Sequence, residues 1–211
     1  MITRRILPLL ATTAILLAAC AAHLQAPTCT TDTVAPTYHP NETWEYRTAA
    51  GDTVTQRVSW IDDHDTYFDW RNTAGPQYSG LTAQQSDNIE IASIGNTITS
   101  TEDSLPFPLH VGQAWSYQQL SYQRTGGPML SEIHHRQVMS CEWVITPAGA
   151  FSALKILDTR TRPADPPSSY FAWYAPQTKS FVKRQHIQGA SPETSALETD
   201  VELLHYSPAA P

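Results

Sequence analysis

The sequence predicts an all-β domain, either a curved antiparallel sheet or an open or half β-barrel of about ten strands. Apolar and polar residues alternate with a period of two in many short segments, which turn residues separate. The chain beyond residue 20 shows no convincing helical periodicity. Six tryptophans, spread nearly one per expected strand, offer large rings for the inside of such a sheet.

The first residues predict a secretion signal that ends in a lipid anchor. Arg4 and Arg5 precede a short apolar run, and Leu17-Ala18-Ala19-Cys20 follows. This pattern resembles bacterial lipoprotein signal peptides, which implies that residues 1–19 are removed and that Cys20 is acylated. The absence of Asp after the cysteine implies, by the same resemblance, the outer membrane, facing the periplasm. An uncleaved transmembrane anchor would need about 20 apolar residues; an ordinary secreted protein is the other alternative.

Composition limits the partners of the mature chain. Of the 13 basic residues the signal peptide removes Arg4 and Arg5 but no acidic residue, so 11 basic and 20 acidic residues leave a formal charge of −9. An acidic chain without basic clusters is a poor candidate for binding nucleic acid. We expect the membrane, through the acyl chains, and an apolar ligand or envelope protein as partners.

Two cysteines remain after Cys20 is lipidated. Cys29 and Cys141 form an even pair in an oxidising compartment, which predicts a disulfide. The alternative is two separate thiols. Residues 20–40 are rich in Thr, Ala and Pro and predict an extended tether that contributes nothing to a core. Residues 41–206 then form a single β domain, and residues 207–211 a loose tail.

The alternation places the expected strands and turns in order along the domain. A meander begins at Thr43, the polar residues 71–87 predict a long loop, and the last strand precedes the tail. On the strand that starts near His135, we expect the odd-numbered face to turn inward at its far end. The residues that define the strands are Trp44 and Tyr46; Val54 to Trp60; Phe68 and Trp70; Ile89 to Ser93; Thr97 to Thr101; Trp115 to Ser121; His135 to Ile145; Leu154 and Ile156; Tyr170 to Ala175; Ser180 to Ile187; and Leu197 to Leu203.

The tryptophans allow two interpretations. They fill the core of a curved sheet, or Trp115, Trp143 and Trp173 line a concave face that holds an apolar ligand. The sequence leaves both open.

Three segments carry a family resemblance. Pro108–Trp115, Gly149–Ile156 and Trp173-Tyr174-Ala175-Pro176 resemble segments of the TapB-like envelope lipoproteins and, more distantly, the open β-barrel of the LolA/LolB carriers. The resemblance runs over residues 40–206 as an order of motifs. It implies a fold and a cell-envelope location but no reaction.

No motif predicts chemistry. His134 and His135 are neighbours on an expected strand and point to opposite faces, so they cannot share a metal without a bulge. The acidic turn at 62–65 lacks the glycine and the terminal glutamate of an EF-hand loop. We therefore assign no catalytic residue, metal or cofactor. The primary hypothesis is a non-catalytic binding module for an apolar ligand or envelope partner; the alternatives are a scaffold with a filled core and a periplasmic enzyme.

Overall fold

A computed structural model describes residues 27, 29, 32–63, 65–75, 80–85, 89–94, 97–102, 104–163, 165–188 and 200–209. Cys20 and the expected signal peptide lie outside these residues. In the described part the chain forms one antiparallel sheet, which confirms the predicted fold class. No helix among these residues has the length and apolar character needed to cross a membrane.

Twelve strands follow one another in this described part, more than the sequence predicted. Most are short, but β8 and β9 are long, with 17 and 13 residues. The strands are β1 (Thr43–Thr48), β2 (Thr53–Ile61), β3 (Asp65–Asn72), β4 (Gly80–Gln85), β5 (Ile89–Ile94), β6 (Thr97–Glu102), β7 (Ala114–Gln123), β8 (Leu130–Thr146), β9 (Gly149–Thr161), β10 (Ser168–Ala175), β11 (Ser180–Gln188) and β12 (Val201–Ser207), with a short 3-10 turn, η2 (Pro176–Thr178), after β10.

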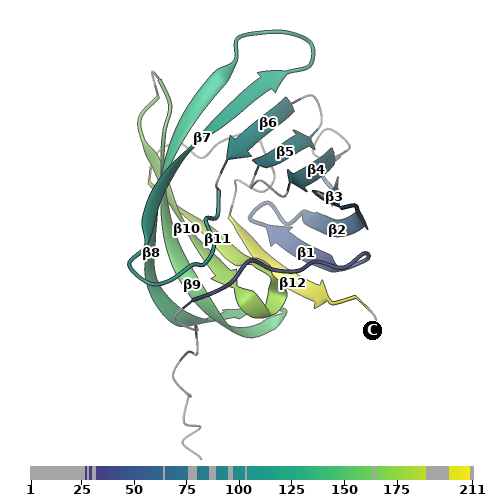
Figure 1. Cartoon of the computed structure of the whole chain (residues 1–211), viewed down its shortest axis with the longest axis vertical. Coiled ribbons are helices and arrows are strands. Elements are labelled where there is room, and N and C mark those ends of the chain that lie inside the picture. The colour runs from purple at the N-terminus through teal and green to yellow at the C-terminus, as the bar shows by residue number, and fades with distance from the viewer. Residues whose placement is uncertain are drawn as a thin grey trace, which may run out of the picture.

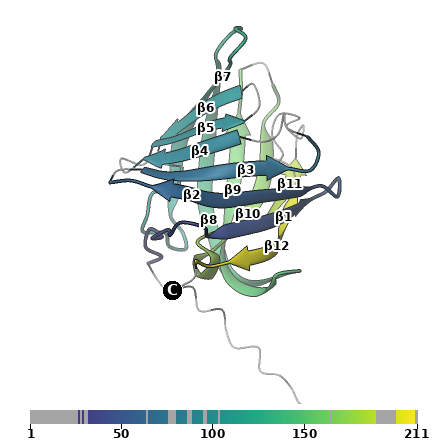
Figure 2. The ribbon, with the colours of Figure 1, turned by 90° about the vertical axis from the view of Figure 1, so that its right-hand side faces the viewer.

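The sheet curls on itself. Neighbours pair in the order β1-β12-β11-β10-β9-β8-β7-β6-β5-β4-β3-β2, and β2 pairs with β1. Strands β7–β11, which include the two long strands, face strands β1–β6 across the molecule (Figure 1). A quarter turn shows β1–β6 crossing in front of β8–β10 (Figure 2). Only two residue pairs join β11 to β12, so the edges of the curled sheet meet over a short seam.

Two expectations about loops are wrong. The polar segment 71–87 contains β4, which pairs with both β3 and β5. Backbone pairing thus makes a strand where side-chain alternation is weak. The expected tether also ends earlier than residue 40. Thr33 is buried and pairs with Leu109, and Tyr38 packs edge-on against Phe68 at a centroid distance of 5.0 Å. Residues 32–40 therefore belong to the domain.

The facing of β8 is the reverse of the expected one. Its even-numbered residues from Glu132 to Val138 are buried, and Val144 and Thr146 are buried at its far end. Ile145 on the odd face is 80% exposed. A bulge between Val138 and Ser140 interrupts the register with β9. The sequence pattern failed here because the inward positions of β8 carry charged residues, and polarity alone assigns such residues to solvent.

The apolar interior has two parts. The first, the aromatic core, joins β1–β3 and β12 to the ends of β8–β11. The second cluster packs beneath the segment that leads into β7. The buried members of the aromatic core are Trp44, Tyr46, Val54, Val58, Phe68, Val144, Ala153, Trp173, Ala175, Val182, Val201 and Leu203. Those of the second cluster are Leu109, Val138, Leu154, Ile156 and Tyr174.

Candidate functional site

The main concentration of reactive side chains in the described chain is a buried group of charges on β8 and β9. We call it the ionic network and define it as Glu132, His134, Arg136, Asp158 and Arg160. All five side chains are buried, and Asp158 is fully so. The strands are paired so that His134 lies opposite Arg160, and Arg136 opposite Asp158. Because alternate residues share a face, this register gathers the charges on one side of the sheet.

Asp158 is the centre of the network. The His134 Nδ1 atom lies 2.9 Å from its Oδ1 atom, and the Arg136 Nε atom donates to its Oδ2 atom. Arg136 also donates from Nη1 to the Ser104 carbonyl at 2.7 Å. Burial raises the pKa of Asp158, but the Arg136 charge and the His134 hydrogen bond outweigh it, so the pKa ends well below its ordinary value. Asp158 is therefore ionised at neutral pH.

Glu132 takes part in a second set of ion pairs. The Arg160 Nη1 atom lies 3.4 Å from its Oε2 atom, and Arg162 donates to its Oε1 atom. The Arg160 Nε atom donates to the Ser168 hydroxyl at 3.2 Å. The His134 Nε2 atom lies 3.7 Å from Glu132 Oε2, beyond hydrogen-bond distance, so this buried nitrogen has no hydrogen-bond partner among the residues that the structure describes.

An aromatic ring covers the network. Tyr117 stacks on His134 with centroids 4.6 Å apart and planes 9° from parallel. The Arg136 guanidinium lies 4.7 Å from the same ring centroid. Burial raises the pKa of Tyr117 well above its ordinary value, so the hydroxyl stays neutral. Burial lowers the pKa of Arg136, but Asp158 and the neighbouring tyrosines raise it more, so the pKa ends above its ordinary value.

This arrangement resembles structural charge compensation more than a reaction centre. Both carboxylates are bonded to guanidinium groups, which leaves neither of them available as a base or nucleophile. The network could not be recognised from the sequence because its residues come from two strands. The available signal was a run of polar residues at every second position, Glu132, His134 and Arg136, directly before an apolar one on the same face.

The histidine pair behaves as strand geometry requires. His134 is buried, whereas His135 is exposed and lies 2.7 Å from the Ser116 hydroxyl through its Nδ1 atom. Among the described residues no three His, Cys, Asp or Glu side chains gather in a way that could hold a metal ion.

The three tryptophans expected on one concave face do not meet. Trp115 packs against the second cluster and Trp173 belongs to the aromatic core. The Trp173 indole donates to Glu142 Oε1 at 2.7 Å. Trp143, the residue after Glu142, therefore points to the opposite side of β8 and is 40% exposed. The ring-lined ligand face was wrong because the bulged and reversed facing of β8 was not foreseen.

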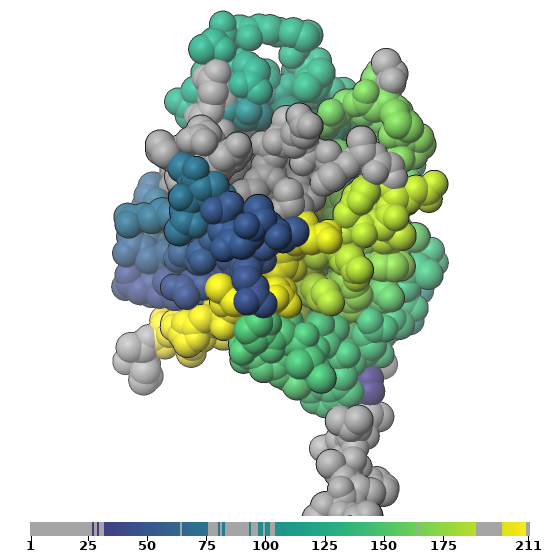
Figure 3. Space-filling view, turned by 180° about the vertical axis from the view of Figure 1, so that it is seen from behind, coloured from purple at the N-terminus to yellow at the C-terminus, as the bar shows by residue number. Residues whose placement is uncertain are grey.

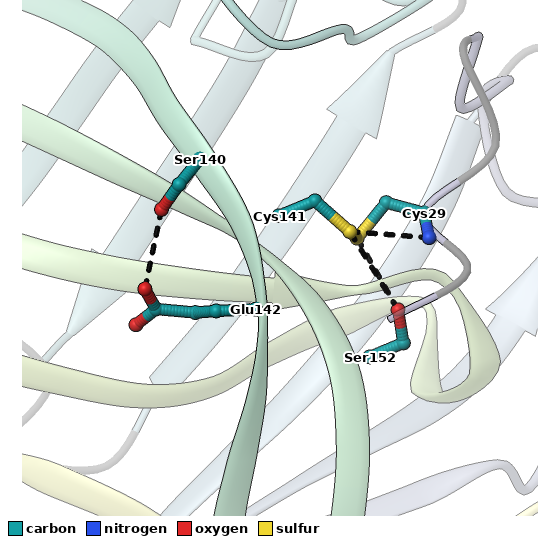
Figure 4. The surroundings of a disulfide bond; sticks show 5 residues. All are labelled: Cys29, Ser140, Cys141, Glu142 and Ser152. Carbon is teal, nitrogen blue, oxygen red and sulfur yellow. Dashed lines mark hydrogen bonds between the residues drawn. A yellow bond between two sulfur atoms is a disulfide. The ribbon is translucent and has the colours of Figure 1, made fainter. Parts of the chain in front are cut away.

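The structure joins Cys29 to Cys141, with Cα atoms 5.8 Å apart. The Ser152 Oγ atom on β9 lies 3.3 Å from Cys29 Sγ, so the N-terminal segment is fixed against the β8–β9 pair. Figure 4 shows Ser140 and Glu142 on the other side of β8 from Cys141. The disulfide therefore attaches the start of the domain to the same face of β8 as Trp143.

Comparisons with known proteins identify the fold. No model of a known protein family matches the sequence, and neither does any curated protein. The structure is similar to a Bacteroides fragilis protein named for its YmcC-like fold and its expected export, with a TM-score of 0.54, 16% identity, and coverage of 84% of this chain and 100% of that one. It is also similar to the hypothetical lipoprotein YmcC of Escherichia coli, with a TM-score of 0.50, 12% identity, and coverage of 82% and 86%.

These similarities establish a YmcC-like fold. They agree with the resemblance to bacterial envelope lipoproteins at that level. The finer resemblance to TapB-like proteins and to LolA/LolB carriers stays a prediction.

Proposed function

We propose that this protein is a lipid-anchored lipoprotein of the bacterial cell envelope, that it is not an enzyme, and that it acts through its outer surface. The lipobox that ends at Cys20 supports the anchor. The YmcC-like fold supports the envelope location, because both structural neighbours are named as exported proteins or lipoproteins. The outer membrane, with the domain facing the periplasm, is the location we propose.

One observation carries the choice of surface over interior: the described interior is occupied by the protein's own side chains. Trp44, Val58 and Leu203 are essentially inaccessible in the aromatic core, and Asp158 is inaccessible in the ionic network. An apolar ligand in this region would have to displace packed rings or separate paired charges. The scaffold hypothesis thus gains support over a ligand held in the concave face.

The experiment compares the full chain with a Cys20→Ser variant, both produced in a bacterial host. We expect mass spectrometry of the mature wild-type protein to find a diacylglyceryl group on Cys20 and fractionation to place it with outer membranes. The Cys20→Ser protein should lose this attachment. An unmodified N-terminus at another residue would refute the anchor.

The soluble domain then tests the interior. Purified Cys20→Ser domain should carry no extractable lipid and should not bind a fluorescent fatty acid stoichiometrically. Saturable binding of one fatty acid per domain would contradict the surface proposal and restore the ligand-binding hypothesis.

A further inference from the structure

An uncharged hairpin end, which carries exposed apolar side chains on one face, lies beside the point where the chain enters the domain. Residues 143–154, which we call the hairpin end, contain no charged residue and no histidine in a chain of net acidic charge. Trp143 and Ile145 are 40% and 80% exposed. Glu142 and Lys155 flank the segment on its two strands. Exposed apolar groups without charge mark a contact surface.

The strand register places these residues on the face to which the N-terminal segment is fixed. Cys141 pairs with Leu154, Trp143 with Ser152, and Ile145 with Ala150, without a bulge between them. Alternate residues point the same way, so Cys141, Trp143 and Ile145 share one face. Cys29 occupies that face through its disulfide.

The position of the anchor fixes what this face meets. Nine residue steps separate Cys20 from Cys29, which limits the tether to about 30 Å when fully extended. The described chain begins at the end of the molecule that carries the hairpin end, away from the β7–β8 turn (Figure 1). From behind, the first described residues (purple) emerge at one side of the teal-green surface of β8 and β9, and β12 (yellow) lies along the other side (Figure 3). The Ala148 amide, at the turn between β8 and β9, donates to the Leu203 carbonyl of β12 at 3.2 Å.

We propose that the hairpin end docks on the lipid bilayer, with Trp143 and Ile145 inserted at its interface and the Cys29–Cys141 disulfide holding them toward it. This inference rests on the lipid anchor of the proposed function. Tryptophan favours the membrane–water interface, and a branched apolar side chain gains by leaving water there. The hairpin end carries no acidic residue, so anionic headgroups do not repel it, whereas they repel the rest of this acidic domain.

The test uses the full, lipidated protein in vesicles of phosphatidylethanolamine and phosphatidylglycerol that contain a lipid brominated on its acyl chain. Bromine quenches only tryptophans that lie close to the acyl region. We expect the Trp143→Phe variant to lose the quenched component of the fluorescence. Trp60→Phe is the matched control, because Trp60 is 45% exposed on β2 and stacks on Tyr67 away from the hairpin end; it should keep the quenched component.

A second pair of variants tests insertion on one strand. Ile145→Glu should abolish the quenching of Trp143. The control is Ile133→Glu, because Ile133 is 46% exposed at the other end of β8; this variant should leave the quenching unchanged. The Cys29→Ala/Cys141→Ala double variant should stay on the vesicles but lose quenching. Unchanged quenching in the disulfide-free protein would overturn the orienting role of the disulfide.

The outcomes separate this inference from the proposed function. Protein that does not float with the vesicles lacks its anchor, which refutes the proposed function and this inference with it. Protein that floats with Trp143 unquenched keeps the anchor and refutes the docking. A cross-link from the hairpin end to an envelope protein in cells, lost in Ile145→Glu and accompanied by unquenched Trp143, would assign this surface to a protein partner instead.

Discussion

The two sides of the described interior are stabilised in opposite ways. Between β1–β3 and β12, rings pack on rings: Trp44 stacks on Tyr206 at a centroid distance of 5.6 Å, and the Trp44 indole donates to the Thr178 carbonyl at 2.6 Å. On β8 and β9 the inward positions carry charges instead, with Asp158 held by His134 and Arg136. One curled sheet thus contains both an apolar core and a compensated ionic one.

The difference determines how each region responds to change. In the aromatic core the free energy of burial grows with apolar area, so removal of methyl groups weakens it in steps. In the ionic network the gain depends on complete pairing, because a charge left alone in the interior is costly to desolvate. A substitution that removes one charge of the network should therefore destabilise the fold more than the small net contribution of the paired charges to stability would indicate.

The largest effect is expected from removal of Asp158. Asp158→Ala should reduce the free energy of unfolding by about 3–5 kcal/mol, since it leaves Arg136 buried without its carboxylate. Chemical denaturation of the Cys20→Ser domain followed by circular dichroism measures this loss. An Asp158→Leu/Arg136→Met double variant, which removes both charges, should recover part of it. A double variant less stable than Asp158→Ala would contradict the view that the unpaired charge is the cause.

The sequence predicted the type of fold well and the facing of its strands less well. Alternation found the core positions Trp44, Tyr46 and Val201 because they are apolar and their neighbours are polar. The same rule gave no reason to bury His134 and Arg136, since nothing in one strand shows that Arg160 and Asp158 lie opposite them. Compensation is a property of two paired strands. It follows from the register between β8 and β9, which the alternation within either strand does not reveal.

The facing of β8 explains why the candidate ligand face was wrong. The apolar odd-numbered residues Trp143 and Ile145 were expected to turn inward, but the buried residues at that end of the strand are Val144 and Thr146. The cysteine pairing could be inferred more simply, because the predicted lipidation of Cys20 would leave only Cys29 and Cys141, which the structure joins.

Acid should affect the two regions differently. The pKa of Asp158 is lower in the folded chain than the ordinary value of about 3.9 in the unfolded chain. Its stabilising contribution is therefore complete above pH ~4 and is lost as the pH falls below that value toward the folded pKa. The difference in unfolding free energy between wild type and Asp158→Asn should therefore shrink as the pH falls from about 5 to about 2.

The aromatic core supplies the matched control for that titration. Leu203→Ala should lower the free energy of unfolding by about 2–5 kcal/mol. This loss should be the same at each pH, because the substitution removes no titrating group. If the loss of unfolding free energy in Asp158→Asn is also the same at every pH, as it is for Leu203→Ala, folding does not lower the pKa of Asp158.

The smallest effect is expected at an ion pair of the same chemistry on the surface. The Arg57 Nη2 atom lies 3.2 Å from Asp69 Oδ2 across β2 and β3, with 46% and 34% of the two side chains exposed. Water solvates both partners before and after the pair breaks, so a double-mutant cycle of Arg57→Ala and Asp69→Ala should give a coupling of about 0.2–1 kcal/mol. Added salt should weaken this coupling and leave the cost of Asp158→Ala nearly unchanged, since screening acts on exposed charges. If the coupling between Arg57 and Asp69 were as large as the loss of unfolding free energy in Asp158→Ala, burial would not be the reason why the two ion pairs differ. The contrast between the ionic network and an exposed ion pair would then fail.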